Sequence, residues 1–167
     1  MVERVQPSPR VRPADLTQDA PAVSAAVHAY LAQTEAEKRR ESGAAGGSGT
    51  AVPERYRPEV EDPSSAYDGC RVLVAEVDDA VVGVIVSRAN DGFTEIKRLW
   101  ADPRVRGRGV GSALLDAAIE AAEGEVRLSV WEWRERAIDL YLSRGFDQVQ
   151  GWDPRPRLVC MIRPATV

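Results

Sequence analysis

Asp102-Pro-Arg-Val-Arg-Gly-Arg-Gly-Val-Gly-Ser112 is the stretch that decides the fold, and Ala-Leu-Leu-Asp-Ala-Ala-Ile-Glu120 follows it directly. Its three glycines, at 107, 109 and 111, stand at the start of an apolar pattern with helical spacing. Glycine lets a backbone turn tightly and approach a ligand closely, and the first N–H groups of a helix have no partner inside it. Those N–H groups and the helix dipole attract anions. The stretch therefore predicts an anion cradle at a helix start, assisted by the forked side chains of Arg104, Arg106 and Arg108.

The spacing of these glycines excludes two common phosphate-binding turns. A P-loop requires a lysine and a hydroxyl residue directly after its last glycine, and no lysine lies near this turn. A dinucleotide fingerprint would be Gly-x-Gly-x-x-Gly after the first strand of the domain, whereas these glycines alternate and follow a later strand. A tight strand-to-helix connection without a ligand is the alternative that the spacing leaves open.

Length and composition indicate one soluble domain. The chain has 167 residues, of which 44% are hydrophobic and 29% charged, and no apolar run approaches the roughly 18 residues of a membrane span. A net charge of −4 argues against a general nucleic-acid binder. The amino terminus lacks a secretory pattern, and Cys70 and Cys160 have no metal-ligand spacing. We therefore expect a cytoplasmic protein without a metal, with a flexible leader at 1–9 and a single domain at 10–167.

Hydrophobic periodicity predicts the element order β-α-α-β-β-β-α-β-α-β-β, an α/β (α+β) fold with a mixed sheet. We expect strands at 10–13, 71–77, 80–87, 94–101, 126–131, 146–150 and 158–162, and helices at 19–33, 35–41, 109–123 and 134–144. Thr17 is the expected cap of the first helix. The glycine- and proline-rich segment 43–68 is expected to be a mobile connection, either a lid or an exposed link.

The apolar residues of the strand before the cradle do not alternate as they would in a regular strand. Ile96, Leu99 and Ala101 have core character, but Ile96 and Leu99 are three residues apart and would face opposite sides of a regular strand. One extra residue between them, a β-bulge, resolves the conflict and leaves backbone groups unpaired. A plain strand with Leu99 in the core is the alternative.

Two separated motifs carry a resemblance to a known family. Arg106-Gly-Arg-Gly109-Val-Gly111 fits the pattern Arg-x-x-Gly-x-Gly, and Leu140-Tyr-Leu-Ser-Arg-Gly-Phe146 follows it in the expected order. On these residues the chain resembles the GNAT superfamily of acetyl-CoA-dependent N-acetyltransferases, over about residues 70–163. The resemblance implies a GNAT-like fold whose bulged fourth strand is splayed from the fifth, and a glycine-rich turn that binds the pyrophosphate of coenzyme A.

The resemblance also implies which residues contact acetyl-CoA, the expected cosubstrate. The backbone of residues 99–101 would hold the pantetheine arm and the thioester oxygen. The full set of implied contacts is Leu99, Trp100, Ala101, Arg106, Gly107, Arg108, Gly109, Val110, Gly111, Ser112 and Arg134. At Arg134 the chain departs from the family, which frequently has Asn there, so this side chain is expected either to contact a phosphate or to remain as exposed charge.

Acetyl transfer to an amine requires a proton for the departing thiolate and an unprotonated nucleophile. The resemblance places Tyr141 near the coenzyme sulfur as general acid, against the alternative of a packing tyrosine. Glu95 is the implied general base, against the alternative of a solvent-facing carboxylate. His28, on the first helix, is expected at the surface.

The acceptor is predicted less directly. Acidic residues at 35–41 and 54–62 favour a small cationic amine, and Trp131 and Trp133 are candidate walls of its pocket. Acetylation of a protein, which needs an open groove, and a coenzyme A-binding module without turnover are the alternatives. Neither a nucleic acid nor a membrane is expected as a partner, and a homodimer is left open.

Overall fold

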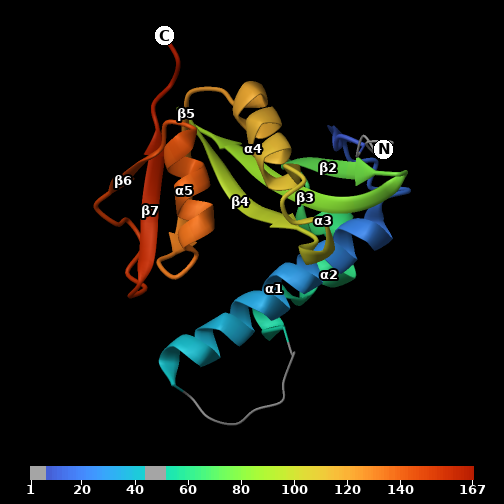
Figure 1. Cartoon of the computed structure of the whole chain (residues 1–167), viewed down its shortest axis with the longest axis horizontal. Helices are drawn as coiled ribbons and strands as arrows, with labels where there is room; N and C mark the ends of the chain where they lie inside the picture. Colours follow the sequence, from blue (N-terminus) through green and yellow to red (C-terminus); the bar gives the residue numbers. More distant parts are fainter. Residues whose placement is uncertain (1–6, 44–51) are drawn as a thin grey trace, which may run out of the picture.

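The computed structural model describes residues 7–43 and 52–167 of the chain, so most of the predicted leader lies outside the described residues. Seven strands form one mixed sheet in the order β1-β2-β3-β4-β5-β7-β6 (Figure 1). The strands are β1 (Arg10–Pro13), β2 (Arg71–Val77), β3 (Ala80–Asn90), β4 (Phe93–Ala101), β5 (Glu125–Trp131), β6 (Asp147–Val149) and β7 (Leu158–Arg163). Only β4 and β5 pair in parallel. The predicted α/β fold with a mixed sheet is confirmed.

Helices cover both faces of this sheet (Figure 1). They are α1 (Ala20–Ser42), α2 (Arg57–Glu61), α3 (Pro63–Ala66), α4 (Val110–Ala121) and α5 (Glu135–Ser143), with short 3-10 turns η1 (Glu54–Tyr56) and η2 (Pro103–Val105). One core packs α4 and α5 against the sheet through residues such as Leu114, Leu115 and Phe146. A second core packs α1 on the opposite face through Val23, Val27 and Leu31. The sheet therefore separates α4 and α5 from α1.

Helix α1 is continuous, which corrects the prediction of two helices at 19–33 and 35–41. The polar turn Gln33-Thr34-Glu35 contains neither glycine nor proline, and its side chains bond along the helix. Thr34 Oγ1 donates to the carbonyl of Tyr30 at 2.9 Å, and Gln33 Nε2 donates to Glu37 Oε1 at 2.8 Å. The helix ends at Gly43, whose φ of 68° is the left-handed conformation that glycine favours. The carboxyl-terminal half of α1 extends past the strands (Figure 1).

Segment 43–68 is only partly described. Residues 44–51 lie outside the described residues, but 54–66 form η1, α2 and α3 where an irregular connection was expected. These turns pack on α1: Tyr67, Tyr56 and Val60 belong to its core cluster, and Ser24 Oγ donates to the carbonyl of Val60. This segment therefore adds a layer beside α1.

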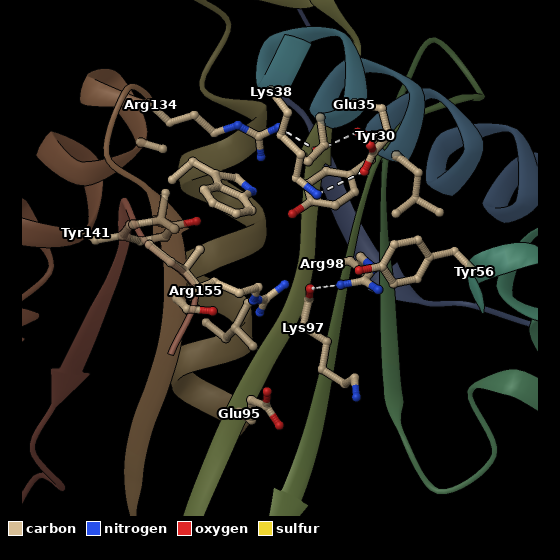
Figure 2. Close-up of a pocket in the computed structure, with 18 residues that line it drawn as sticks. Tyr30, Glu35, Lys38, Tyr56, Glu95, Lys97, Arg98, Arg134, Tyr141 and Arg155 are labelled. Atoms are coloured by element: carbon tan, nitrogen blue, oxygen red, sulfur yellow. Dashed lines mark hydrogen bonds and ion pairs between the residues drawn. The ribbon is translucent and has the colours of Figure 1, made fainter. Parts of the chain in front are cut away.

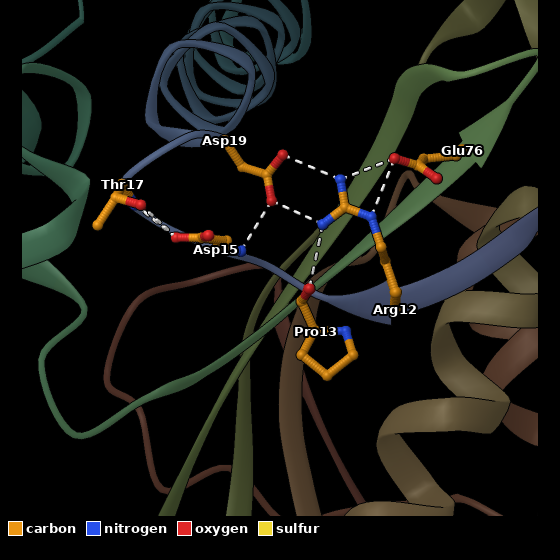
Figure 3. A network of polar contacts seen from close by, with 6 residues as sticks. All are labelled: Arg12, Pro13, Asp15, Thr17, Asp19 and Glu76. Atoms are coloured by element: carbon orange, nitrogen blue, oxygen red, sulfur yellow. Dashed lines mark hydrogen bonds and ion pairs between the residues drawn. The ribbon is translucent and has the colours of Figure 1, made fainter.

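The start of α1 is fixed by an ion network that replaces the predicted Thr17 cap (Figure 3). Thr17 bonds Asp15, and Asp19 occupies the N-cap position. The Asp19 carboxylate accepts from Arg12 Nη1 at 2.7 Å and Nη2 at 3.0 Å, while Arg12 also donates to Glu76 of β2. Hydrogen bonding to Arg12 lowers the pKa of Asp19. The network ties β1, β2 and α1 together.

The predicted bulge lies in β4 at Lys97. Val86 of β3 pairs with Arg98 and the next residue, Ser87, pairs with Ile96, so Lys97 has no partner in the register. Pairing between β4 and β5 then covers only residues 93–95 against 125–127. Beyond Glu95 the two strands no longer pair, which confirms the bulged fourth strand splayed from the fifth.

Candidate functional site

The glycine-rich turn begins α4 with an open cradle of backbone groups. Gly107 and Gly109 have φ of 78° and 74°, in the left-handed region that other residues rarely adopt. The first bond inside the helix is donated by Ala113 to Gly109, at 2.9 Å, so the N–H groups of residues 110–112 precede the helical ladder. A Cβ added at position 107, 109 or 111 would meet no atom within 4 Å. The cradle therefore has room for a ligand and donors to bind an anion.

The arginines of the turn differ in what they can offer such a ligand. Arg104 is held by Asp102, whose carboxylate accepts from Arg104 Nη2 at 2.5 Å and from its backbone N–H at 2.9 Å. Arg106 is exposed beside the cradle. The Nε atom of Arg108 is buried and has no hydrogen-bond partner in the described structure. Arg106 and Arg108 thus keep donors near the cradle. Arg104 directs Nε and Nη2 at Asp102 but is 88% exposed and keeps Nη1 outside that ion pair.

A groove of about 780 Å³ leads away from the cradle. Ala101, Arg106 and Gly107 line it on one side, the start of α5 on another, and the end of α1 closes it at Glu37 and Arg40. Beyond Glu95 the edge of β4 that faces β5 is unpaired. Successive residues of a strand direct their backbone groups to opposite edges. Because Asp102 N–H donates to Val82 of β3 at 2.8 Å, the backbone groups of Leu99 and Ala101 lie on the open edge and are available to a ligand, whereas those of Trp100 face β3 and its side chain packs into the core beside α1.

A second, smaller cavity of about 260 Å³ lies on the α1 side of the splay (Figure 2). Tyr141 enters it from α5, Tyr30 from α1, Tyr56 from η1 and Arg155 from the turn between β6 and β7. Arg134 and Ala137 line both this cavity and the groove. The two spaces are therefore neighbours at the beginning of α5, where Arg134 and Ala137 form their shared wall.

Tyr141 occupies the position expected of an acid. Its side chain is 7% exposed, and its hydroxyl points into the cavity (Figure 2). Burial, together with nearby Tyr30, raises the pKa of Tyr141 above its ordinary value of 10.0. A phenol with a raised pKa keeps its proton at neutral pH and can donate it.

Glu95 lines the same cavity at its far end. It is exposed, and no ion pair among the described residues includes it. The bulge at Lys97 brings Glu95 and Arg98 to one face of β4, although the two residues are three positions apart. The carboxylate is thus accessible to a ligand in the cavity.

Arg134 is not the exposed charge that was one of its two expected environments. Its Nε donates to Glu37 at 2.8 Å and its Nη2 to Thr34 Oγ1 at 2.7 Å, and the side chain is 17% exposed. Trp133 Nε1 donates to the same Glu37 carboxylate at 3.0 Å. These donors are bound to α1, and the contact of Arg134 with a coenzyme phosphate stays a prediction. Arg134 instead joins α5 to α1.

The two tryptophans stack with ring centroids 4.9 Å apart, but only Trp131 lines the cavity. Trp133 lines the groove instead. His28 is exposed on α1, as expected.

Sequence reasoning missed most of the polar side chains of the cavity, among them Tyr30, Tyr56, Lys97, Arg98 and Arg155. Tyr30 stands at an apolar-spaced position of a helix, and that pattern gives no sign of a cavity. Arg155 stands between two prolines, which indicates a turn, but the sequence does not indicate which surface its side chain faces.

Within residues 7–43 and 52–167, no three His, Cys, Asp or Glu side chains gather as a metal site. Nor does any helix in this part of the chain combine the length and the apolar character needed to cross a membrane.

Comparisons with known proteins agree on one family. A model of the acetyltransferase (GNAT) family matches residues 36–146. An uncharacterized N-acetyltransferase of Methanocaldococcus jannaschii is 34% identical over 94 residues, 48% of this chain and 42% of the relative. An N-alpha-acetyltransferase of Sulfurisphaera tokodaii is 35% identical over 95 residues, 47% of this chain and 57% of the relative. A thialysine N-epsilon-acetyltransferase of Bos taurus is 30% identical over 64 residues, 34% of this chain and 38% of the relative.

The matches thus span little more than half of these relatives at most. Among solved structures, the PaiA N-acetyltransferase of Thermoplasma acidophilum, in complex with coenzyme A, superimposes with a TM-score of 0.68 at 16% identity. The superposition covers 95% of this chain and 100% of that one. At this identity the likeness shows the fold.

Proposed function

The chain belongs to the acetyltransferase (GNAT) family, and on this premise we propose that it transfers an acetyl group from acetyl-CoA to the primary amine of a small molecule. One observation carries the proposal. The cradle opens into a groove that adjoins the tyrosine-lined cavity where β4 and β5 have separated, with Arg134 and Ala137 as a shared wall. We expect the arm of a ligand anchored at the cradle to follow this opening toward the cavity.

The residues present fit acetyl-CoA. The N–H groups of residues 110–112, with Gly107 and Gly109 leaving room, would hold the pyrophosphate. Arg106 and Arg108 add donors for the phosphate oxygens. The unpaired edge at Leu99 and Ala101 would bind the pantetheine arm, and one N–H there would stabilise the charge that develops on the thioester oxygen. When bound, acetyl-CoA supplies an activated acetyl group on sulfur.

Two side chains would move protons. The Tyr141 hydroxyl, protonated at neutral pH, donates to the departing thiolate. Glu95 accepts a proton from the amine, directly or through water, because its carboxylate lines the cavity and has no ion-pair partner in the described part of the chain. The acceptor amine would lie between these two residues.

The size of the cavity favours a small acceptor. Its walls come from α1, η1, β4, β5 and the turn before β7, so it is bounded on several sides. A protein chain needs an open groove to present its amine. Acetylation of a protein amino terminus is the second candidate, supported by the similarity to an N-alpha-acetyltransferase.

The acidic segments were expected to attract a cationic acceptor, but their glutamates form ion pairs within the chain. Glu35 binds Lys38, Glu37 binds Arg134, Glu41 binds Arg157 and Glu59 binds Arg98. Arg57 pairs with both Glu54 and Glu61. Because these carboxylates are neutralised internally, they supply little field for attracting a free cation. The proposal therefore keeps the primary amine and drops the requirement for a net positive charge.

Thiol release from acetyl-CoA with a panel of amines tests the proposed function. Tyr141→Phe should lower kcat by about 100-fold or more, within the range that a positioned acid contributes. Tyr67→Phe is the control, because it removes a buried hydroxyl outside the cavity, one that donates to Glu59 at 2.8 Å. Unchanged turnover by Tyr141→Phe would refute the acid assignment. Tight acetyl-CoA binding without turnover on any amine would instead favour a coenzyme A-binding module.

Two further expectations stay predictions. A cytoplasmic location is tested by cell fractionation, and a homodimer by light scattering of the purified chain.

A further inference from the structure

The cavity beside Tyr141 presents more cationic than anionic side chains. Its charged lining residues are Lys38, Lys97, Arg98, Arg134, Arg155, Glu35 and Glu95. The carboxylates that pair with the three arginines belong to Glu59, Glu37 and Asp153, and none of these lines the cavity. The carboxylates that neutralise the three arginines thus lie outside the cavity, whereas the arginines themselves line it.

Two of these arginines are parts of the cavity wall. Arg98 donates to both carboxylate oxygens of Glu59, at 3.1 and 3.0 Å, and to the carbonyl of Lys97. Arg134 is bound to Glu37 and Thr34. Each side chain is 17% exposed. These two guanidinium groups contribute positive potential, but their donors are largely committed.

Arg155 and Lys97 are the accessible cations. Arg155 directs Nε and Nη2 at Asp153 and leaves Nη1 outside that ion pair, with the side chain 47% exposed. Figure 2 shows its guanidinium in the middle of the cavity, between Tyr141 and Lys97. Lys97 is the bulged residue of β4, and no ion pair of the described residues includes it. Both side chains can therefore donate to an added anion.

Tyr56 lies beside two of these cations. Burial raises the pKa of this tyrosine, but a hydrogen bond from Arg55 and the positive charges of Arg55, Arg98 and Lys38 outweigh that effect and lower the pKa of Tyr56 below 10.0. Arg98 and Lys38 line the cavity together with this phenol, whereas Arg55 does not. Part of the positive charge that acts on Tyr56 thus belongs to the cavity.

The coenzyme phosphates do not account for these cations. The cradle residues Arg106 and Gly107 line the groove and not the cavity. Of the cations in the cavity, only Arg134 borders both spaces, and it is bound to α1. The anion that Arg155 and Lys97 would bind therefore comes from the acceptor.

We infer that the acceptor is an amino acid or a similar amino-carboxylate, whose carboxylate binds Arg155 and Lys97 while its amine lies between Glu95 and Tyr141. The inference rests on the proposed acetyl transfer and adds that the acceptor carries a carboxylate. Glu95 and Lys97, two residues apart in the bulged strand, offer one unpaired charge of each sign to such a zwitterion. The Arg155 fork can bind a carboxylate with two parallel bonds once it rotates from Asp153.

Paired acceptors test this inference. L-Lysine, L-serine, L-phenylalanine and glycine are each compared with the corresponding carboxamide, and 1,5-diaminopentane serves as the cationic acceptor without a carboxylate. We expect at least one acid to exceed its amide by about 10- to 100-fold in kcat/KM, the range of a hydrogen bond to a charged group. Arg155→Gln should lower kcat/KM for the acid to about that for its amide and so remove the preference. Arg144→Gln, which removes a partly exposed arginine paired with Asp116 outside the cavity, is the charge-matched control and should keep the preference.

Binding is measured separately by calorimetry, with the same acids and amides titrated into protein saturated with coenzyme A. Binding of an acid that is lost in Arg155→Gln and kept in Arg144→Gln supports the inference even without turnover. Amides or 1,5-diaminopentane that equal or exceed every acid, in turnover and in binding, overturn it. Failure of the proposed function has a different signature, because all acceptors would then remain unacetylated while acetyl-CoA binds.

Discussion

Replacing Gly109 by glutamate tests the anion cradle most directly. The glycine has a φ of 74°, and a Cβ at this position would meet no atom within 4 Å. The substitution therefore meets no steric obstacle in the fold, but it forces a side chain into the left-handed region at a cost of about 1–2 kcal/mol. A domain with the usual 5–15 kcal/mol of stability remains folded after this loss.

The effect on the ligand is expected to be much larger. Two like charges about 4 Å apart near a protein surface repel by about 4 kcal/mol at an effective dielectric constant of 20. Each 1.4 kcal/mol changes a dissociation constant tenfold, so the carboxylate should weaken acetyl-CoA binding by about 1000-fold. Gly109→Ala has the same backbone strain without the charge and should weaken binding by less than about tenfold.

Gly69→Glu provides the matched control. Gly69 has a φ of 75°, and a Cβ there also meets no atom within 4 Å, but the residue lies before β2 and does not line the groove. Calorimetric titration with acetyl-CoA and thermal unfolding are measured on all three variants. Gly109→Glu and Gly69→Glu should lose similar stability, and only Gly109→Glu should lose binding. Equal affinity in these two variants would refute the assignment of the phosphate site to this turn.

Other predictions concern stability. Glu37→Ala leaves buried Arg134 without its counter-ion and should cost about 3–5 kcal/mol in denaturant unfolding, whereas a loss below about 1 kcal/mol would contradict the role of this pair. Hydrogen bonding to Arg12 lowers the pKa of Asp19, so the stability it provides is present above the unfolded pKa near 3.9 and lost as pH falls through the folded value. Asp19→Asn should flatten this acid limb of the unfolding profile. Gly83→Ala places a Cβ 2.9 Å from side-chain atoms of α4, and should lower the free energy of unfolding by about 1–3 kcal/mol.

The sequence predicts the parts of the site that depend on local chemistry. The alternating glycines predict a turn at the start of a helix, and Gly107 and Gly109 have positive φ directly before α4. The bulge was predictable because Ile96 and Leu99 both have core character at an impossible spacing for a regular strand, and Lys97 is the residue that the register omits. Such features are determined by a few adjacent residues.

Long-range charge pairing was not predictable in this way. Arg134 and Glu37 are 97 residues apart, and neither residue type specifies the other as its partner. The acidic segments suggested a field for a cationic substrate because each carboxylate was counted as free. In the structure their partners come from distant elements, as Arg98 does for Glu59 and Arg157 for Glu41. Net charge along a segment therefore says little about the charge that a cavity presents.

The continuity of α1 explains why Arg134 replaces a smaller side chain at the start of α5. Because α1 does not end near residue 33, its last turns pass over the opening between β4 and β5 and border both the groove and the cavity. An asparagine at position 134 would be too short to reach α1 as Arg134 does, through Nε to Glu37 and Nη2 to Thr34. Without that contact, only Trp133 would join Glu37 to the start of α5. Arg134 thus holds α1, which closes the groove, against the start of α5. At this position the resemblance implies a coenzyme-binding asparagine, whereas here the residue stabilises the contact between two helices.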